Sequence, residues 1–148
     1  KNDERESIIT AQIKTKTVLL QFILEMWKKG FVTENDTSGR NTVEKEMVSY
    51  IQQNFTGTIS LKEFGEQFHL SEKYISRYFK EHFHITISQY VTYLRLKHAK
   101  QLLQDTDIPV TEIAMQSGYQ NISYFIRSFK KTYEVSPLQY RKNKLTEI

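Results

Sequence analysis

The chain has 148 residues, of which 39% are hydrophobic and 26% charged, and this balance excludes wholesale disorder and indicates a globular protein. It contains no cysteine, which excludes disulfides, thiolate metal sites and cysteine nucleophiles, and no apolar run approaches the roughly 20 residues that span a bilayer. Residues 1–70 carry a net charge of −1 and residues 71–148 one of +5, so the second half favours a polyanionic partner, although a solvated basic face would carry the same charge.

The first segment, residues 4–32, is predicted to be one helix because its apolar residues recur three or four positions apart: Ile9, Ile13, Leu20, Ile23, Leu24, Trp27 and Phe31. Residues 33–41 are polar and contain a glycine, which predicts a linker between a segment of residues 1–40 and a domain of residues 41–148. The helix either forms a homodimer or packs on that domain, and Lys16 disfavours a strict coiled coil. Because the chain begins at Lys1 rather than Met, we interpret it as a fragment or a processed chain from which an upstream domain is missing.

A series of helix starts follows. Asn41 with Glu44, Ser60 with Glu63 and Thr86 with Gln89 have the spacing of a capping box, in which two side chains satisfy free backbone N–H groups. Ser71 caps another helix, and Pro109 fits a first turn, where its missing N–H is harmless. The predicted helices cover residues 41–54, 61–68, 71–82, 86–104, 109–117 and 121–133, and Ser136, Pro137 and Gln139 open a last one. No segment alternates as a strand, so the predicted fold class is all-α.

An internal repeat is the strongest feature of the chain. Five residues recur 49 positions later, because Leu61, Phe64, Gly65, Phe68 and Leu70 match Val110, Ile113, Ala114, Ser117 and Tyr119. After a one-residue insertion, residues 74–80 match residues 124–130, and both stretches read Tyr-apolar-x-Arg-x-Phe-Lys. Each copy has a short helix with a small residue for close crossing, a tight turn and a second amphipathic helix, which predicts two helix-turn-helix units.

The second helix of each copy has the pattern of a DNA recognition helix. Its apolar residues four apart (Ile75 and Phe79, Phe125 and Phe129) share one face, and its polar residues lie elsewhere. Short polar and Arg side chains aimed at base edges are what such a helix needs. The 19-residue helix between the copies spans roughly 28 Å at 1.5 Å per residue. That length approaches the ~34 Å of one DNA turn, so the helix would serve as a rigid spacer.

Residues 43–141 resemble the DNA-binding domain of the AraC/XylS transcription regulators. The resemblance is carried by LSEKYISRYFKEHF, ISQYVTYLRLKHAKQLLQDTDIPVTEIAMQSGY and SYFIRSFKKTYEVSPLQYR. It implies seven helices, two helix-turn-helix units and a linking helix, with both recognition helices in successive major-groove segments of double-stranded DNA. It also implies transcription activation through RNA polymerase and, in many members, a separate effector-binding or dimerisation domain. In terms of this resemblance, residues 1–40 would be the tail of such a missing sensor or dimerisation domain.

The resemblance also implies site residues. Lys73, Ser76 and Arg77 of the first unit, and Ile122, Ser123, Tyr124 and Arg127 of the second, would meet bases, and Lys80 and Lys130 would meet phosphates. The turns after the recognition helices usually hold a glycine, but here they hold His84 and Glu134, so we expect those turns to differ locally. Ile122 can contact a thymine methyl but cannot hydrogen-bond a base.

Other functional classes find little support. The four histidines, His69, His82, His84 and His98, lack a carboxylate pair that would complete a ligand set, so neither a metal nor a cofactor is expected. The chain has no phosphate-cradling glycine loop, nucleophile motif or HExxH, so we do not expect an enzyme, and methyl-accepting DNA repair proteins of this type need cysteines. We expect a cytoplasmic regulator that does not bind membranes. The alternative is a helical protein-interaction module, which salt-dependent duplex binding would distinguish.

Overall fold

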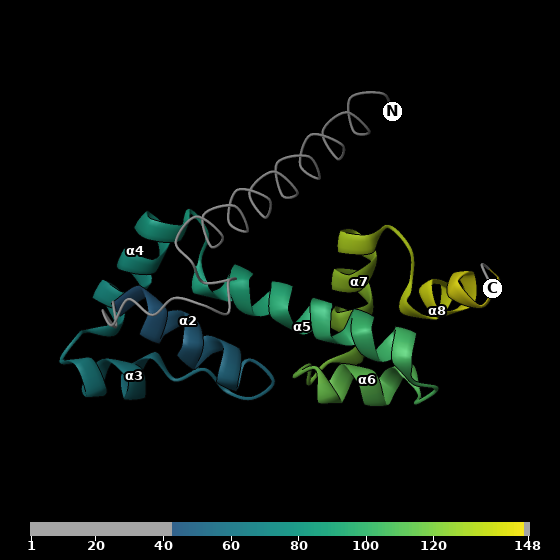
Figure 1. Ribbon diagram of the computed structural model, residues 1–148, viewed down its shortest axis with the longest axis horizontal. Helices are drawn as coiled ribbons and strands as arrows, with labels where there is room; N and C mark the ends of the chain where they lie inside the picture. The colour runs from purple at the N-terminus through teal and green to yellow at the C-terminus, as the bar shows by residue number, and fades with distance from the viewer. Residues whose placement is uncertain (1–42, 147–148) are drawn as a thin grey trace, which may run out of the picture. The chain divides into compact units, whose positions relative to one another are not determined.

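The computed structural model describes residues 43–146 of the chain, and every regular element in that range is an α-helix. In chain order the helices are α2 (Val43–Asn54), α3 (Leu61–Phe68), α4 (Glu72–Phe83), α5 (Ile87–Asp105), α6 (Val110–Gln116), α7 (Ile122–Tyr133) and α8 (Pro137–Thr146) (Figure 1). The all-α prediction is confirmed. None of these helices is long and apolar enough to cross a membrane. The helix predicted over residues 4–32 and the linker of residues 33–41 lie outside the described residues.

Several helix starts have the predicted caps, and the predicted cap at Asn41 lies outside the described residues. At the start of α5, the Thr86 N–H donates to Gln89 Oε1 at 2.8 Å and the Gln89 N–H donates to Thr86 Oγ1 at 3.1 Å. This reciprocal pair is the predicted capping box. At the start of α8, the Gln139 N–H donates to Ser136 Oγ at 3.2 Å. Short-range hydrogen bonds of this kind therefore set where the helices begin.

Two starts differ from the prediction. Ser60 Oγ accepts the Glu63 N–H at 3.2 Å, but the Ser60 N–H donates to the Tyr50 hydroxyl at 3.3 Å and not to Glu63. Tyr50 also donates to the Ser60 carbonyl at 3.1 Å, so α2 supplies the partner that the capping box assigned to Glu63. Pro109 is the residue before α6 and has ψ 146°, so it precedes the first turn that it was predicted to occupy.

The described residues form two compact units. The first contains residues 43–51 and 60–89, and the second contains residues 52–59 and 90–146. Each unit holds one copy of the internal repeat, because α3 packs on α4 in the first and α6 packs on α7 in the second. In the second unit α7 also packs on α8. The predicted helix-turn-helix organisation is thus present in each unit.

The core of the first unit depends on a close crossing of α3 and α4. Its buried apolar residues are Met47, Val48, Ile51, Phe64, Ile75, Phe79, Phe83 and Ile85. A Cβ atom added at Gly65 would overlap the Leu70 carbonyl oxygen and lie 3.1 Å from Ile75 Cδ1. The Leu70 N–H also donates to the Gly65 carbonyl at 2.9 Å, which fixes the turn between the helices. The small residue predicted at the crossing is therefore required there.

The core of the second unit is built from Leu96, Ala99, Leu103, Ile113, Ala114, Tyr119, Phe125 and Phe129. Ala114 is fully buried, and its carbonyl accepts the Tyr119 N–H at 2.9 Å, as Gly65 accepts that of Leu70 in the first unit. Arg95 ties the loop after α2 to this unit, since its Nε donates to the Phe55 carbonyl at 2.6 Å and its Nη2 to the Gly57 carbonyl at 2.9 Å. The two copies thus share the backbone hydrogen bond between the short helix and the turn, but the small residue is Gly65 in the first and Ala114 in the second.

Candidate nucleic-acid interface

Helices α4 and α7 have the same burial pattern over the ten residues that begin at their N-terminal caps. In residues 71–80 only Ile75 and Phe79 are buried, and in residues 121–130 only Phe125 and Phe129 are buried, at the same places. Ser71 Oγ accepts the Tyr74 N–H at 3.2 Å, and Asn121 Oδ1 accepts the Tyr124 N–H at 2.8 Å. Both helices are therefore held by buried anchors at the same two positions. Helix α4 has a third, Phe83, where α7 has the half-buried Tyr133.

The turns that follow these helices keep a left-handed residue although neither contains glycine. His84 has φ 59° and Glu134 has φ 69°, so the expectation that these turns differ locally is wrong. The His84 N–H donates to the Lys80 carbonyl at 2.9 Å, and the Glu134 N–H to the Lys130 carbonyl at 2.8 Å. These bonds satisfy helix-end carbonyls and offset the steric cost of a side chain in the left-handed region.

A third left-handed residue was not predicted. His69, between α3 and α4, has φ 56°, and its counterpart in the second unit is Gly118 with φ 86°. A Cβ at Gly118 would lie 2.8 Å from both Arg95 Nε and the Thr56 carbonyl oxygen, so the second unit admits only glycine there. The only sequence signal for His69 was its alignment with Gly118 in the repeat.

On α4, the predicted site residues Lys73, Ser76, Arg77 and Lys80 are all exposed, on the surface that faces away from the core. Arg77 Nε lies 3.8 Å from Glu81 Oε1, and both side chains are about two-thirds exposed (66% and 64%). The Arg77 guanidinium also lies 5.8 Å from the centre of the Tyr74 ring. An ion pair this exposed contributes little to stability, so Arg77 can leave Glu81 for another anion at small cost.

On α7, the predicted residues Ile122, Ser123, Tyr124, Arg127 and Lys130 are likewise exposed. The position that matches Glu81 holds Lys131, so α7 carries three cations and no carboxylate, whereas α4 carries three cations and two carboxylates. The two helices therefore present the same shape with different charge, and α7 is the more strongly cationic of the two.

Three residues of this surface were missed from the sequence. The 50-residue offset matches Tyr124 with Tyr74 and Ser76 with Ile126, and Tyr74 and Ile126 are each 38% exposed. Lys131 is exposed beside Lys130. Applying the offset strictly to every chosen residue would have found Tyr74 and Ile126, because each matches a residue that was already in the set.

Helix α4 is anchored to α2 through a carboxylate. The Tyr78 hydroxyl donates to Glu44 Oε1 at 2.9 Å, and His82 Nδ1 lies 3.7 Å from the same oxygen. Partial burial and the adjacent Glu44 raise the pKa of Tyr78 to about 12, so its hydroxyl remains a donor at neutral pH. Within the described range, no three His, Asp or Glu side chains are placed to hold a metal ion.

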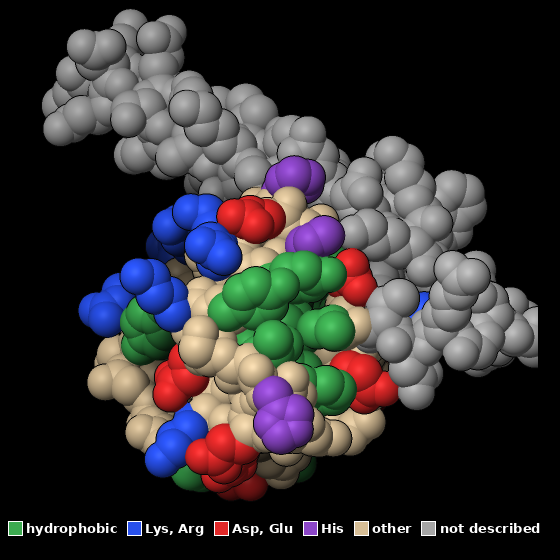
Figure 2. All heavy atoms as spheres, turned by 90° about the vertical axis from the view of Figure 1, so that its left-hand side faces the viewer, with side chains coloured by type: hydrophobic (Ala, Val, Ile, Leu, Met, Phe, Trp, Pro, Cys, Tyr) green, Lys and Arg blue, Asp and Glu red, His purple; other side chains and the backbone are tan. Residues whose placement is uncertain are grey.

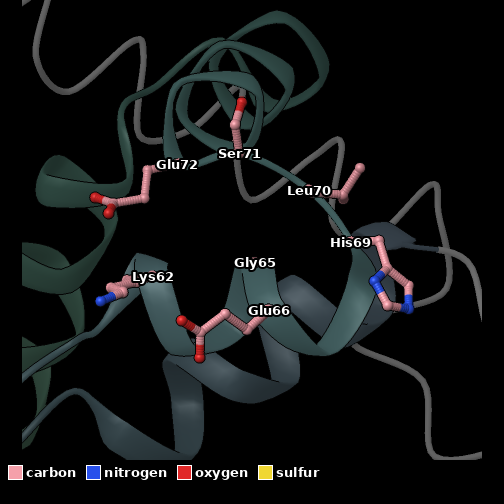
Figure 3. A pocket seen from close by; sticks show the side chains of 7 residues that line it. All are labelled: Lys62, Gly65, Glu66, His69, Leu70, Ser71 and Glu72. Atoms are coloured by element: carbon pink, nitrogen blue, oxygen red, sulfur yellow. The ribbon is translucent and has the colours of Figure 1, made fainter.

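Helices α2, α3 and α4 of the first unit face the viewer in Figure 2, where Lys and Arg side chains gather along one margin and hydrophobic side chains occupy the middle. A groove of about 500 Å³ lies between α3 and the start of α4 (Figure 3). Its charged lining consists of Lys62, Glu66 and Glu72, with His69 at one end. Two carboxylates against one ammonium do not favour a phosphate, so this groove is not a candidate site for a polyanion.

Comparison with protein families and curated proteins gives a consistent result. A family model described as a helix-turn-helix domain matches residues 64–143. The melibiose operon regulatory protein of Escherichia coli K12 is 29% identical over 132 residues, which are 84% of this chain and 44% of that protein. The transcriptional activator RhaS of Mannheimia succiniciproducens is 35% identical over 109 residues, 72% of this chain and 41% of that protein. The chain thus spans less than half the length of these relatives.

Solved structures share the fold. The C-terminal domain of AraT, a response regulator from Geobacillus stearothermophilus, has a TM-score of 0.64 at 34% identity, covering 72% of this chain and 88% of that domain. A Chromobacterium violaceum regulator with an AraC-type DNA-binding domain has a TM-score of 0.60 at 25% identity, covering 67% and 88%. The DNA-binding domain of AdpA, solved with a target DNA, has a TM-score of 0.62, covering 69% and 92%; its 20% identity supports the fold alone.

Proposed function

The chain belongs to the AraC/XylS family of DNA-binding transcription regulators, and we propose that it inserts α4 and α7 into successive major-groove segments of one DNA duplex. The observation that supports this mode of binding is the equivalence of the two helices. They share two buried anchor positions, a side-chain N-terminal cap and a left-handed residue at the C-terminal end, and both expose an Arg at the matching position. An α-helix of this kind fits the width of the major groove.

The cations divide into two roles in this proposal. Lys80, Lys130 and Lys131 lie toward the C-terminal ends of the helices and neutralise phosphates, which sets register and orientation. Arg77 and Arg127 lie closer to the middle and reach base edges, where Arg binds the O6 and N7 atoms of guanine. Arg77 first releases Glu81, and the exposure of that pair makes the exchange inexpensive.

The regulatory outcome that we propose is activation through a contact with RNA polymerase. It is supported by the relative RhaS, which is described as a transcriptional activator. We also propose that the chain acts as a homodimer, paired through residues 1–40 or a further domain. Dimeric regulators of DNA bind two sites related by the symmetry of the protein, so a repeated operator would support this arrangement.

The test is fluorescence anisotropy with a pool of random duplexes at several salt concentrations, followed by selection of the tightest binders. We expect affinity to fall with salt by about 0.9 logarithmic units per phosphate contact for each tenfold rise in concentration. We expect the selected sites to have two halves about one helical turn apart. Absence of duplex binding at low salt would contradict the proposal and would favour a helical module that binds another protein.

A further inference from the structure

Two exposed isoleucines distinguish the surface of α7 from that of α4. Ile122 and Ile126 are 37% and 38% exposed, and they lie four residues apart, so they are neighbours on one flank of the helix. The matching positions of α4 hold Glu72 and Ser76. Phe125 and Phe129 are fully buried and hold α7 in place. The two isoleucines are therefore an addition to the surface that the packing of the helix does not require.

The surroundings of the isoleucine pair are cationic. Arg127 follows Ile126 directly, and Lys130 lies one further helical turn along the same flank. No carboxylate occurs within α7. An apolar surface bordered by cations complements a polyanion that carries apolar groups. In the major groove of DNA the apolar group is the 5-methyl group of thymine, which aliphatic side chains contact.

We propose that Ile122 and Ile126 make the second unit a reader of thymine 5-methyl groups. The inference depends on the proposed entry of α7 into the major groove and adds the feature that it recognises there. The half-site bound by α7 is then defined largely by the positions of thymines. The half-site bound by α4 is defined by hydrogen bonds from Lys73, Ser76 and Arg77. The two halves of one operator are read by different chemistry although the helices have the same build.

The experiment uses the full chain and the duplex selected by the anisotropy test. Each thymine is replaced in turn by deoxyuridine, which lacks only the 5-methyl group, and affinity is measured at constant salt. We expect a loss of about fourfold for each methyl group that an isoleucine covers, since burying one methyl-sized group contributes about that factor. The sensitive positions should lie in the half-site whose base preference changes in Arg127→Ala.

A matched variant assigns the effect to the side chain. Ile126→Ser introduces the residue that α4 carries at this place, and the exposed position leaves the core intact. We expect this variant to bind the thymine duplex about fourfold more weakly and to bind the thymine and deoxyuridine duplexes equally at one position. Ser76→Ala serves as the comparison: it removes a proposed base contact of α4 and should lower the overall affinity, but it should keep the full ratio of thymine to deoxyuridine affinity. Thermal unfolding of both variants should match that of the unchanged protein.

The outcomes separate this inference from the proposed function. Equal binding of thymine and deoxyuridine duplexes, with salt dependence and site preference retained, would overturn the thymine reading and leave the two-helix DNA mode standing. Sensitivity to deoxyuridine that persists in both Ile126→Ser and Ile122→Ser would also overturn it, because another side chain would then cover the methyl groups. Absence of duplex binding would refute the proposed function and this inference together.

Discussion

Arg77 and Arg127 occupy matching positions, and their surroundings predict specific losses on mutation. We expect Arg77→Ala and Arg127→Ala each to weaken binding to the selected duplex by about 1–3 kcal/mol, because each removes a guanidinium that we propose binds a base. Binding to random duplexes should fall by less, since only a general attraction to phosphates is lost. Competition anisotropy with selected and random duplexes measures the two losses side by side.

The control is Lys97→Ala, which removes an exposed cation from α5 and leaves α4 and α7 unchanged. We expect it to lower both affinities slightly and by the same factor. If Arg77→Ala and Arg127→Ala behaved like this control, the two arginines would be phosphate anchors and not readers of bases.

Gly65→Ala, which adds a single Cβ atom, is predicted to change the stability of the first unit. Ala is the better helix former by about 1 kcal/mol, so Gly65→Ala would stabilise an open helical site. At this site the added Cβ would overlap the Leu70 carbonyl oxygen, which belongs to backbone and cannot rotate away. We therefore expect a loss of about 1–3 kcal/mol, measured by thermal or denaturant unfolding.

A second glycine provides the comparison. A Cβ at Gly57 would meet its nearest neighbour, the Asn54 carbonyl oxygen, at an ordinary 3.7 Å, so Gly57→Ala should be tolerated. An unchanged or higher melting temperature for Gly65→Ala would show that the helix crossing can open, and our account of the first unit would fail.

The local structure of some single residues could be predicted from the sequence, and that of others could not. The close helix crossing at Gly65 and the exposure of Arg77 and Arg127 could be predicted, because the repeat places these residues at corresponding positions of two amphipathic helix pairs. The left-handed backbone of His84 and Glu134 was not predicted, since glycine is the usual sequence signal for that conformation, and the only signal for His69 was its alignment with Gly118. Tertiary packing and the helix-end hydrogen bonds fix these turns in spite of the side chain.

At the scale of helices, prediction worked where the determining contacts are local. The predicted C-terminal ends of α3 and α7 match the structure, and those of α4 and α5 differ from it by one residue. Caps and apolar periodicity act within a few residues, so both can be read along the chain. The Ser60 cap was half wrong because its second partner, Tyr50, comes from the preceding helix, ten residues away.

The different charges of α4 and α7 lead to a prediction for each helix as a whole. Glu81→Lys gives α4 the residue that α7 carries at this place, removes the partner of Arg77 and adds a cation beside it. We expect tighter duplex binding at low salt and a salt dependence steeper by about 0.9 if the new Lys neutralises one phosphate. The advantage should shrink at high salt, where charges are screened.

The reciprocal variant is Lys131→Glu, which gives α7 the residue of α4. It should weaken binding and flatten the salt dependence by a similar amount. If neither variant changed the salt slope, the C-terminal parts of these helices would lie away from the phosphates, and the proposed docking of α4 and α7 would need a different orientation.

At the scale of the whole molecule, the order of the helices along the chain did not predict which residues belong to each unit. Residues 52–59 precede the first helix-turn-helix copy in sequence but belong to the unit that contains the second. Arg95 holds this loop by hydrogen bonds to the carbonyls of Phe55 and Gly57, which lie about forty residues earlier in the sequence. No local sequence pattern near Phe55 or Gly57 predicts these bonds. Contacts between distant segments have no periodic or capping signature, so the repeat predicted two units but not their boundaries.

The spacing of the operator tests whether both units bind one duplex together. Helix α5 is continuous over 19 residues, so we expect the chain to tolerate little change in the distance between half-sites. Inserting about 5 base pairs turns the second half-site to the opposite face of the DNA. Affinity for that duplex should fall to the level of one half-site alone, as measured by anisotropy.

A 10-base-pair insertion restores the second half-site to the original face of the DNA but adds about 34 Å to the spacing. Binding to this duplex should be equally weak if α5 acts as a rigid spacer. Recovery with 10 but not 5 base pairs would instead mean that the linkage can stretch but not twist. Full affinity with both would show that the units bind independently, and the repeat would then supply two separate readers rather than one bipartite reader.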